Sequence, residues 1–549
     1  MKPLSSWRPY AWIILICLAL YFRTLFFDFT YLDDKQLILD NFGFLADPSN
    51  FLKVFQQKAF AGSAIPYYRP VLTLTFMLDT FFAGPSPFIY HLTNVLLHIL
   101  ASCLVFRLLI TLKYRRQPSF FFSALFAAHP VLTQAVAWIP GRNDVLLAVF
   151  VLLSFLSFLH YIEAGRSPYY WRHVLFLLLA LFTKESAVML MPLCFVYAYF
   201  VKKEGFSFGK EARLLAAWFI ATAFWFSLRQ RALAGTMETP LFGMLAALFV
   251  SLPAFIQFFG KALMPANLSV FPTIRDTPFV YGVISGLVVA AALFFSKDKD
   301  RRAALFGFLW FTFFLLFTFI RPTHRSVLDF QEHRAYLPLI GFIMMMSEID
   351  IFKNMDLKMK SKELILCGLT VGVFSAMTLS HCNDFRDRMA FWGNASRTSL
   401  NSSFVHLNVG FIYYMDGLLD KAEEEYDKAI SLDPKTPMAH TKLGILYMDK
   451  KMFKEAEAEF KKEMEQDPYV DAAYVCLGVI YYRDGRLKEA EALWQKALEL
   501  RPYNADALKN LGIYYFEKKD FARAAYYTKK LQSAGMKPPP EFLKKLGID

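Results

Sequence analysis

The sequence is poor in charged residues and in cysteine. Only 19% of its 549 residues are Asp, Glu, Lys or Arg, whereas about a quarter are charged in an average soluble domain. Its six cysteines include no pair at metal-ligand or redox spacing, so the sequence supports neither a disulfide framework nor a zinc site. No glycine-rich phosphate loop follows an expected strand, which leaves a nucleotide site of familiar type without support. The class of ordinary cytosolic globules is thereby excluded.

Hydrophobic residues make up 56% of the chain, and the charges that remain are unevenly placed. Residues 401–549 carry 23 basic and 24 acidic side chains, so the net charge of +13 arises entirely from the first 400 residues. This contrast predicts two domains in two different solvents. A nucleic-acid surface would need basic residues clustered on a soluble face, and the polar part is close to neutral, so nucleic acid is not an expected partner.

The first part of the chain contains long apolar runs of the kind that cross a membrane. Eleven spans are predicted, with the N-terminus cytoplasmic because Lys and Arg are dense in connections such as 112–118, 202–213 and 297–302. Residues 242–264, which Pro253 interrupts, are interpreted as a re-entrant or interfacial element. An odd number of spans exports the C-terminus. The predicted spans are 11–27, 91–111, 119–136, 145–161, 173–183, 186–201, 214–228, 278–296, 303–320, 337–350 and 364–381.

The last 150 residues repeat with a period of 34. Gly410, Gly444, Gly478 and Gly512 keep this spacing, a Tyr follows each Gly by three positions, and an Ala follows each by twelve. This pattern predicts tetratricopeptide repeats, each a pair of antiparallel helices. Such arrays bind extended peptide in a concave groove, although a spacer or a dimerisation surface is the alternative. Thr528, at the position where the other repeats have an aromatic residue, suits a terminal repeat.

The expected fold class is therefore all-α, with a polytopic membrane domain followed by an exported α-solenoid. The predicted boundaries are a membrane domain at 1–382, a linker at 383–402, four repeats at 403–436, 437–470, 471–504 and 505–538, and a tail at 539–549.

Unusual polar residues fall mostly on the exported side of this topology. Charged groups in or beside a membrane are costly and are treated as functional candidates. A carboxylate at an acceptor hydroxyl can act as a general base, and Arg, Lys and His can hold a phosphate leaving group. Taken together, these acidic and basic side chains favour an enzyme that transfers a group from a lipid phosphate. The candidates are Asp33, Asp34, Arg69, His129, Arg142, Asp144, Lys184, Glu185, His324, His333 and Arg334, with a stripe of His91, Asn94 and His98 in the second span.

Each candidate also has a purely structural interpretation. The His91, Asn94 and His98 stripe is more simply explained as hydrogen bonds that join helices, and arginines at helix ends often only reach the headgroups. Adjacent aspartates in a loop commonly cap a helix. However, acids and bases from at least four connections converge on one membrane face. This convergence makes a functional site a better explanation for the whole set than for any single residue in it.

Several strings resemble one known family. DDKQLILDN, YYRPVLTLTF, HLTNVLLH, AAHPVLTQAVAWIPGRND, FTKESA and PANLSVF, with tetratricopeptide repeats after the last span, are similar to the transmembrane-and-tetratricopeptide O-mannosyltransferases of the C-type-fold glycosyltransferase superfamily. The resemblance covers essentially the whole chain. It implies inverting transfer of mannose or a similar hexose from a polyprenyl- or dolichyl-phosphate carrier to a hydroxyl, with Ser or Thr of a protein as acceptor in eukaryotic members.

The resemblance also implies roles for particular residues. One of Asp33 and Asp34 would be the base, with a slight preference for Asp34, and Arg142 and Arg69 would bind the donor phosphate. QEHRAYLP departs from the family's usual string, which leaves the roles of His333 and Arg334 open. His129, Lys184, His333 and Arg334 are further phosphate candidates, and Asp144, Glu185, His91, Asn94, His98 and His324 are other polar candidates of the site.

The short repeat array resembles bacterial members, for which the repeats would be periplasmic at the inner membrane; in a eukaryote they would be luminal in the endoplasmic reticulum. No cofactor is implied, although an adjacent pair of aspartates could contribute to a divalent-metal site that needs further ligands. Two other functions remain as alternatives: a non-catalytic anchored scaffold for envelope or secretory proteins, and a transporter, for which matched broken helices are missing from the pattern.

Overall fold

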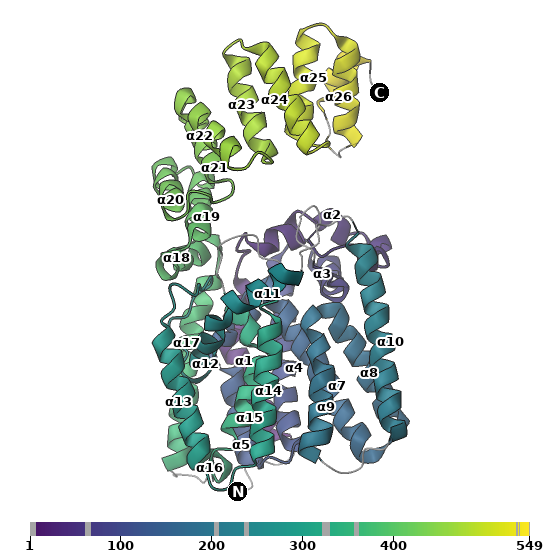
Figure 1. Ribbon diagram of the computed structural model, residues 1–549, viewed down its shortest axis with the longest axis vertical. Helices are drawn as coiled ribbons and strands as arrows, with labels where there is room; N and C mark the ends of the chain where they lie inside the picture. The colour runs from purple at the N-terminus through teal and green to yellow at the C-terminus, as the bar shows by residue number, and fades with distance from the viewer. Residues whose placement is uncertain are drawn as a thin grey trace. The chain divides into compact units, whose positions relative to one another are not determined.

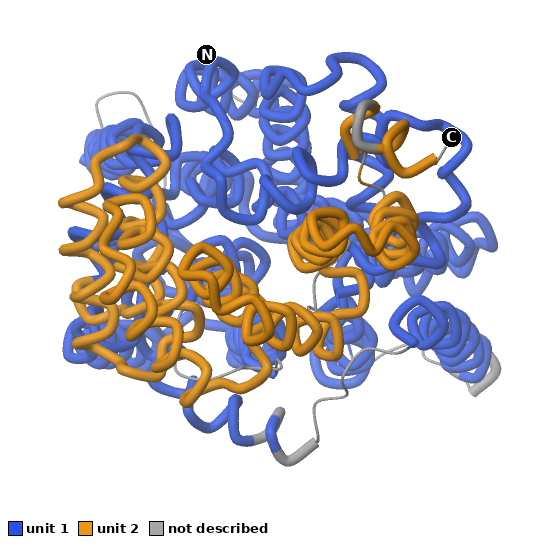
Figure 2. The backbone as a smooth tube through the Cα atoms, turned by 90° about the horizontal axis from the view of Figure 1, so that it is seen from above, with its two compact units in different colours: residues 1–399 blue, residues 400–549 orange. Residues whose placement is uncertain are grey.

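The computed structural model describes residues 7–60, 67–202, 208–234, 241–320, 330–355, 362–533, 536 and 538–547. Every regular element within these ranges is a helix (Figure 1), which confirms the all-α prediction. The chain divides into two compact units, residues 1–399 and 400–549 (Figure 2).

Unit 1 contains long apolar helices. In the described residues, five are long and apolar enough to cross a membrane: Arg8–Phe26, Pro87–Thr111, Ile139–Ala164, Glu185–Lys202 and Lys362–Phe385. A sixth arises if Arg116–Ala127 and Pro130–Ala137, which meet at 47°, form one broken span. Of the other predicted spans, 214–228 lies in the 25-residue α10 (Phe208–Ala232), and the rest are helices of 9 to 17 residues, such as α8 (Ser167–Thr183) and α15 (Pro338–Met346). The count of eleven spans stays a prediction.

The long spans are built from α1 (Arg8–Tyr21) with η1 (Phe22–Phe26), α4 (Pro87–Thr111), α5 (Arg116–Ala127), η5 (Pro130–Leu132), α6 (Thr133–Ala137), η6 (Ile139–Gly141), α7 (Arg142–Ala164), η7 (Glu185–Met189), α9 (Leu190–Val196), η8 (Tyr197–Lys202), α17 (Lys362–Cys382) and η10 (Asn383–Phe385). The other helices of unit 1 are η2 (Lys35–Leu39), α2 (Phe42–Leu45), η3 (Pro48–Asn50), η4 (Lys53–Gln56), α3 (Pro70–Ala83), α10 (Phe208–Ala232), α11 (Leu241–Val250), α12 (Leu252–Leu263), α13 (Phe279–Phe295), α14 (Arg301–Phe317), η9 (Glu332–Ala335), α16 (Asp350–Lys353) and α18 (Arg388–Thr398).

The helix α7 is at the centre of unit 1. Its span is 83% buried, whereas the span containing α17 is only 17% buried. The helices α4 and α8 pack against α7, and α14 packs against α15 where Gly307 meets Gly341. A Cβ at Gly307 would lie 2.7 Å from the carbonyl oxygen of Gly341. Two glycines therefore allow the backbones of α14 and α15 to approach closely, as small residues do between membrane helices.

The outer helices present large apolar side chains to their surroundings. Phe219 on α10 is 75% exposed, and Phe294 and Phe295 on α13 are 77% and 76% exposed. A soluble protein rarely exposes apolar side chains in such numbers, so these faces are suited to contact lipid. Unit 1 is a multi-pass membrane domain.

Two predicted interruptions of the chain differ in the structure. The segment expected to be re-entrant is divided into α11 and α12 at Ser251, and Pro253 lies in the first turn of α12. Residues 383–402, expected as a linker, contain η10 and α18, and the boundary between the two units falls after Ser399. Ser399 itself donates a hydrogen bond to the carbonyl oxygen of Phe271 at 2.5 Å. The first part of this segment therefore belongs to the packed membrane unit.

Unit 2 is a stack of helix pairs of the tetratricopeptide kind. Its glycines lie against the aromatic residue sixteen positions later: a Cβ at Gly410 would lie 2.7 Å from the Tyr426 ring, and one at Gly478 2.5 Å from the Trp494 ring. The helices are α19 (Ser403–Met415), α20 (Leu419–Leu432), α21 (Ala439–Asp449), α22 (Phe453–Gln466), α23 (Asp471–Arg483), α24 (Leu487–Leu500), α25 (Ala505–Glu517) and α26 (Phe521–Ser533), followed by α27 (Pro540–Leu546).

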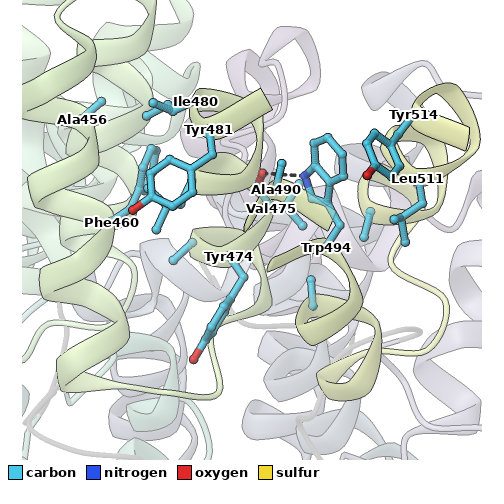
Figure 3. Packing of buried hydrophobic residues seen from close by; sticks show 14 of the residues in the cluster. Ala456, Phe460, Tyr474, Val475, Ile480, Tyr481, Ala490, Trp494, Leu511 and Tyr514 are labelled. Carbon is cyan, nitrogen blue, oxygen red and sulfur yellow. Dashed lines mark hydrogen bonds between the residues drawn. The ribbon is translucent and has the colours of Figure 1, made fainter. Parts of the chain in front are cut away.

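Aromatic residues continue from one repeat to the next. Trp494 donates a hydrogen bond from Nε1 to the carbonyl oxygen of Val475 at 3.2 Å, and its ring lies 6.2 Å from that of Tyr514 in the next repeat (Figure 3). Tyr447 and Tyr481 each donate to a glutamate of the preceding repeat, 24 residues earlier. These repeated contacts join neighbouring repeats into one continuous core, as expected of a solenoid.

Candidate functional site

A cluster of charged side chains lies at one end of the helices of unit 1. The helices α7 and α8 are antiparallel neighbours, so the first turn of α7 and the residue after α8 share this end. There the ammonium of Lys184 contacts both carboxylate oxygens of Asp144, at 2.7 and 2.8 Å. Burial lowers the pKa of Lys184, opposed by Asp144 and reinforced by the positive charges of Arg69 and Arg334. Residues from four separate segments therefore act on one another here.

His333 joins this cluster from η9. Its Nε2 lies 3.7 Å from Oδ2 of Asp144, and its ring lies 5.6 Å from that of Trp138. Gln134 accepts a hydrogen bond from the backbone N–H of His333 at 3.0 Å and donates to the side chain of Gln331 at 2.7 Å. The helix α6 thus positions the turn that carries His333 and Arg334.

Arg69 enters the cluster from the N-terminus of α3. Its guanidinium lies 3.5 Å from Glu185 and 4.2 Å from the centre of the Tyr67 ring. Burial acts to lower the pKa of Arg69, but Glu185, Tyr67 and the carboxylates of Asp144 and Asp33 outweigh it, and the pKa is raised. Arg69 is 9% exposed, and its buried Nε has no hydrogen-bond partner in the described residues.

The two adjacent aspartates differ in their surroundings. Asp34 is 1% exposed and caps η2. Its carboxylate accepts hydrogen bonds from the backbone N–H of Thr30 at 2.5 Å, the Thr30 hydroxyl at 3.1 Å and the backbone N–H of Lys35 at 3.1 Å. Burial raises the pKa of Asp34 to about 6, although these hydrogen bonds act to lower it. Asp33 is only half-buried and contributes to the field around Arg69.

Arg142 is separated from this cluster by its own set of partners. It is fully buried and pairs with Asp79 at 2.5 Å. Its nitrogens also donate to Asn94 at 2.7 Å, to Thr75 at 3.1 Å and to the carbonyl oxygen of Tyr90 at 2.7 Å. Each nitrogen of the guanidinium has at least one of these partners, so Arg142 joins α3, α4 and α7 and its charge is compensated by Asp79. Its expected role in binding the donor phosphate stays a prediction.

The polar stripe of α4 makes structural contacts. His98 is hydrogen-bonded through Nδ1 to the Tyr336 hydroxyl at 2.7 Å and through Nε2 to the carbonyl oxygen of Ala127 at 3.1 Å. Asn94 donates to carbonyl oxygens around Trp138 at 3.2–3.3 Å, and His91 packs edge-on against Phe27. The hydrogen bonds of His98 and Asn94 agree with the interpretation of the stripe as a means of joining helices, whereas both ring nitrogens of His91 are buried without a hydrogen-bond partner in the described residues.

A second buried charge cluster supports η9 from behind; sequence reasoning noted Glu332 among the unusual polar residues but missed its partners. Glu332 pairs with Lys261 of α12, and His381 of α17 lies 3.4 Å from Glu332 and 2.8 Å from Asp384. Burial acts to raise the pKa of Glu332, but Lys261 and His381 outweigh it and lower the pKa. The sequence signal that could have revealed this cluster is Lys261, an isolated lysine in the apolar run of α12.

Two further candidates lie outside the cluster or outside the described part. His129 is hydrogen-bonded through Nε2 to the carbonyl oxygen of Ala262 at 3.1 Å, so it ties the α5–α6 bend to α12. His324 falls in 321–329, outside the described residues. Within the described residues no three His, Cys, Asp or Glu side chains are grouped so that they could hold a metal ion. The carboxylate of Asp34 accepts hydrogen bonds from Thr30 and Lys35, and a divalent metal at the aspartate pair stays a prediction.

The fold and the cluster together define a multi-pass helical membrane protein with a polar site at one end of its helices and a tetratricopeptide domain. Two family models match the second unit: "Tetratricopeptide repeat" over residues 469–531 and "TPR repeat" over residues 410–451. Among solved structures, the chain is similar to PilW, a type IV pilus biogenesis factor (24% identity, 29% of this chain and 78% of that one, TM-score 0.27), and to MamA (22%, 26% and 88%, TM-score 0.24).

Curated relatives cover the membrane unit as well. The chain is 38% identical over 144 residues to the protein O-mannosyl-transferase TMTC1 of Mus musculus (24% of this chain, 15% of the relative) and 34% identical over 227 residues to tmtc2 of Xenopus laevis (37% and 27%). It is 26% identical over 460 residues to the protein O-mannosyl-transferase F38B6.6 of Caenorhabditis elegans, covering 77% of this chain and 62% of that protein. The matches thus span less than two thirds of these relatives. They confirm the resemblance to the transmembrane-and-tetratricopeptide O-mannosyltransferases.

Proposed function

We propose that this protein is a membrane-embedded O-mannosyltransferase that moves mannose or a similar hexose from a polyprenyl- or dolichyl-phosphate carrier to a Ser or Thr hydroxyl of a protein. The observation that carries the proposal is the meeting of Arg69, Lys184 and Arg334 at one end of the membrane helices, where the carboxylate of Asp33 also acts on Arg69. The curated relatives named as protein O-mannosyl-transferases support the same reaction class.

The cations of the cluster suit the phosphate of a lipid-linked donor. Arg69 and Lys184 are each oriented by a carboxylate, Glu185 and Asp144. An arginine held in this way can present N–H groups to phosphate oxygens and stabilise the charge that develops as the phosphate leaves. The apolar walls of the surrounding helices would accommodate the polyprenyl chain.

A carboxylate of the first long connection is proposed as the base. In the reaction, the acceptor oxygen bonds to the anomeric carbon, the bond from that carbon to the phosphate oxygen breaks with its electrons going to phosphate, and the hydroxyl proton goes to a carboxylate. A base must reach the hydroxyl. The half-buried Asp33 satisfies this condition better than Asp34, which is enclosed by its own hydrogen bonds. We therefore assign the proton transfer to Asp33 and a positioning role to Asp34, the reverse of the slight preference from the sequence.

Sidedness and acceptor binding complete the proposal. The concentration of Lys and Arg in the connections at the other end of the helices favours a cytoplasmic location for that end and a non-cytoplasmic location for the site. The repeats would then be exported and recruit the acceptor protein. This arrangement places donor, acceptor and base in one compartment.

The test is sugar transfer in proteoliposomes that contain the full chain, radiolabelled polyprenyl-phosphate mannose and a Ser/Thr-rich acceptor peptide. Asp33→Asn should abolish transfer, and Asp34→Asn should reduce it strongly. Asp40→Asn is the matched control, because Asp40 is an exposed acid of the same connection that pairs with Lys35 at 2.7 Å. Unchanged transfer by the Asp33→Asn protein would refute the site assignment. Retention of cellular function by both site variants would favour the scaffold alternative.

A further inference from the structure

Trp138 contacts two segments of the candidate site that are far apart in the sequence. It lies between α6 and η6, and it is only 3% exposed. Its ring lies 5.6 Å from that of His333 on η9. Its indole Nε1 donates a hydrogen bond at 3.0 Å to the hydroxyl oxygen of Thr30, in the first long connection. One side chain therefore joins the turn that carries His333 to the segment that carries the two adjacent aspartates.

The direction of the hydrogen bonds around Thr30 follows from what each group can donate. An indole N–H can only donate, so the Thr30 oxygen accepts in its bond with Trp138. A hydroxyl has a single hydrogen, and an ionised carboxylate can only accept. The Thr30 hydroxyl hydrogen is therefore available to the carboxylate of Asp34, whose Oδ2 lies 3.1 Å from the Thr30 oxygen. We call these three side chains the hydrogen-bond chain Trp138–Thr30–Asp34.

Burial makes each bond of this hydrogen-bond chain count. Thr30 is 2% exposed and Asp34 is 1% exposed. In such surroundings a hydrogen bond is electrostatically stronger than in water, and consecutive hydrogen bonds polarise one another. Donation from Trp138 to the Thr30 oxygen therefore strengthens the bond from the Thr30 hydroxyl to the carboxylate. Because Asp33 directly precedes Asp34, contacts that fix Asp34 also fix the backbone that carries Asp33.

The titration of Asp34 reports on these contacts. Burial raises the pKa of Asp34 to about 6, and the hydrogen bonds from Thr30 and from backbone N–H groups act to lower it. Weakening the bond from Thr30 therefore raises the pKa further. The titratable and charged groups that lie around the hydrogen-bond chain on neighbouring segments are Asp33, Lys35, His333 and Arg388.

We propose that Trp138 is a positioning residue of the transfer reaction: its indole N–H directs the Thr30 hydroxyl onto the carboxylate of Asp34 and so holds the aspartate pair in the geometry that transfer requires. Trp138 acts through Thr30 and is not itself a catalytic residue. The inference rests on the proposed function for its effect on transfer, whereas the hydrogen-bond chain is testable without transfer.

The first measurement is the infrared carbonyl band of protonated Asp34 in the full chain, reconstituted in lipid and titrated with acid. The band is identified by its absence from the Asp34→Asn protein. Trp138→Phe keeps an aromatic ring and removes the N–H, so the midpoint of the band should move upward by about half a unit, a fraction of the effect of a whole hydrogen bond.

Trp392→Phe is the matched control. Trp392 of α18 is 2% exposed, and its Nε1 has no hydrogen-bond partner among the residues that the structure describes. The substitution therefore removes a buried indole of the same size without breaking a hydrogen bond. Its infrared midpoint should equal that of the wild type.

The same variants are then assayed for sugar transfer in proteoliposomes. Trp138→Phe should lower kcat about two- to tenfold, the range expected for one neutral hydrogen bond, and leave the KM for polyprenyl-phosphate mannose unchanged. In the Thr30→Val background, Trp138→Phe should move the infrared midpoint no further, because its effect passes through the Thr30 hydroxyl.

An unmoved infrared midpoint in the Trp138→Phe protein would overturn the inference, even if its melting temperature were lower, because Trp138 would then have a structural role only. A shift that persists in the Thr30→Val background would overturn it as well. Absence of transfer by the wild type would refute the proposed function, whereas the infrared midpoints would still decide on the hydrogen-bond chain.

Discussion

The hydrogen bond from the Thr30 hydroxyl to Asp34 offers a direct test of how the acidic pair is held. Burial raises the pKa of Asp34 to about 6 even with three donors on its carboxylate. Protonation of Asp34 removes acceptor capacity and loosens its bonds to Thr30, so the neighbouring Asp33 loses its support. We expect sugar transfer to fall as the pH decreases through about 6.

Replacing Thr30 by Val removes one of the three donors that stabilise the ionised carboxylate. A hydrogen bond to a charged group contributes about 1.5–3 kcal/mol, and one pKa unit corresponds to about 1.4 kcal/mol. The midpoint of the pH profile should therefore move upward by about one to two units in the Thr30→Val protein. Thr30→Ser keeps the hydroxyl, and its midpoint should remain near that of the wild type.

The assay is the proteoliposome transfer reaction measured between pH 4.5 and 8.5. Thr24→Val is a second control, because the buried Thr24 hydroxyl donates to the carbonyl oxygen of Tyr21 and not to a carboxylate. An unchanged midpoint in Thr30→Val, with only a lower maximum rate, would refute the reasoning. The same pKa has a consequence for folding: because the folded-state pKa of Asp34 is raised, its stabilising contribution is fully present below pH 4 and is lost as the pH rises through 6.

Three further predictions follow from buried contacts. Arg142→Met leaves the carboxylate of Asp79 buried without its cation and should destabilise the protein by about 3–5 kcal/mol; Arg142→Met/Asp79→Leu should recover thermal stability and, because the proposed site assigns the phosphate to Arg69 and Lys184, some transfer. Gly478→Ala should lower the melting temperature of the full chain because overpacking costs about 1–3 kcal/mol, whereas Gly512→Ala, whose added Cβ would meet only a Thr hydroxyl at 3.3 Å, should leave it unchanged or raise it. Lys261→Met leaves the Glu332 carboxylate buried without its cation and should lower the free energy of unfolding by several kcal/mol, as measured by chemical denaturation. An unaltered unfolding midpoint would contradict the assigned pair.

The repeat domain was predictable in detail because its signals are local and repeated. Each small residue at the glycine position implies a large residue sixteen positions later in the same repeat, and the distances at Gly410 and Gly478 agree with this rule. The fourth repeat was expected to depart from it, and Gly512 indeed meets only the hydroxyl of Thr528. The helical membrane unit was predictable for the same reason, since long apolar runs carry their own signal.

The partners of individual charges were not predictable. Arg142 stands in a conspicuous motif, but Asp79, which neutralises it, lies 63 residues earlier in an apolar helix and has no motif of its own. The pair of Lys261 and Glu332 is separated by 71 residues and joins α12 to η9. Such pairings depend on how helices meet in three dimensions, which apolar periodicity does not encode.

The comparison of two arginines indicates what separates a binding group from a structural one in this protein. Both Arg69 and Arg142 are buried, and both lie beside a carboxylate and an aromatic ring. The guanidinium of Arg142 uses every nitrogen within the protein, so its charge is fully compensated. Arg69 keeps a loose contact of 3.5 Å to Glu185, and its Nε has no hydrogen-bond partner among the residues that the structure describes. A buried donor without a partner costs free energy unless a ligand satisfies it, and a phosphate at Arg69 would do so.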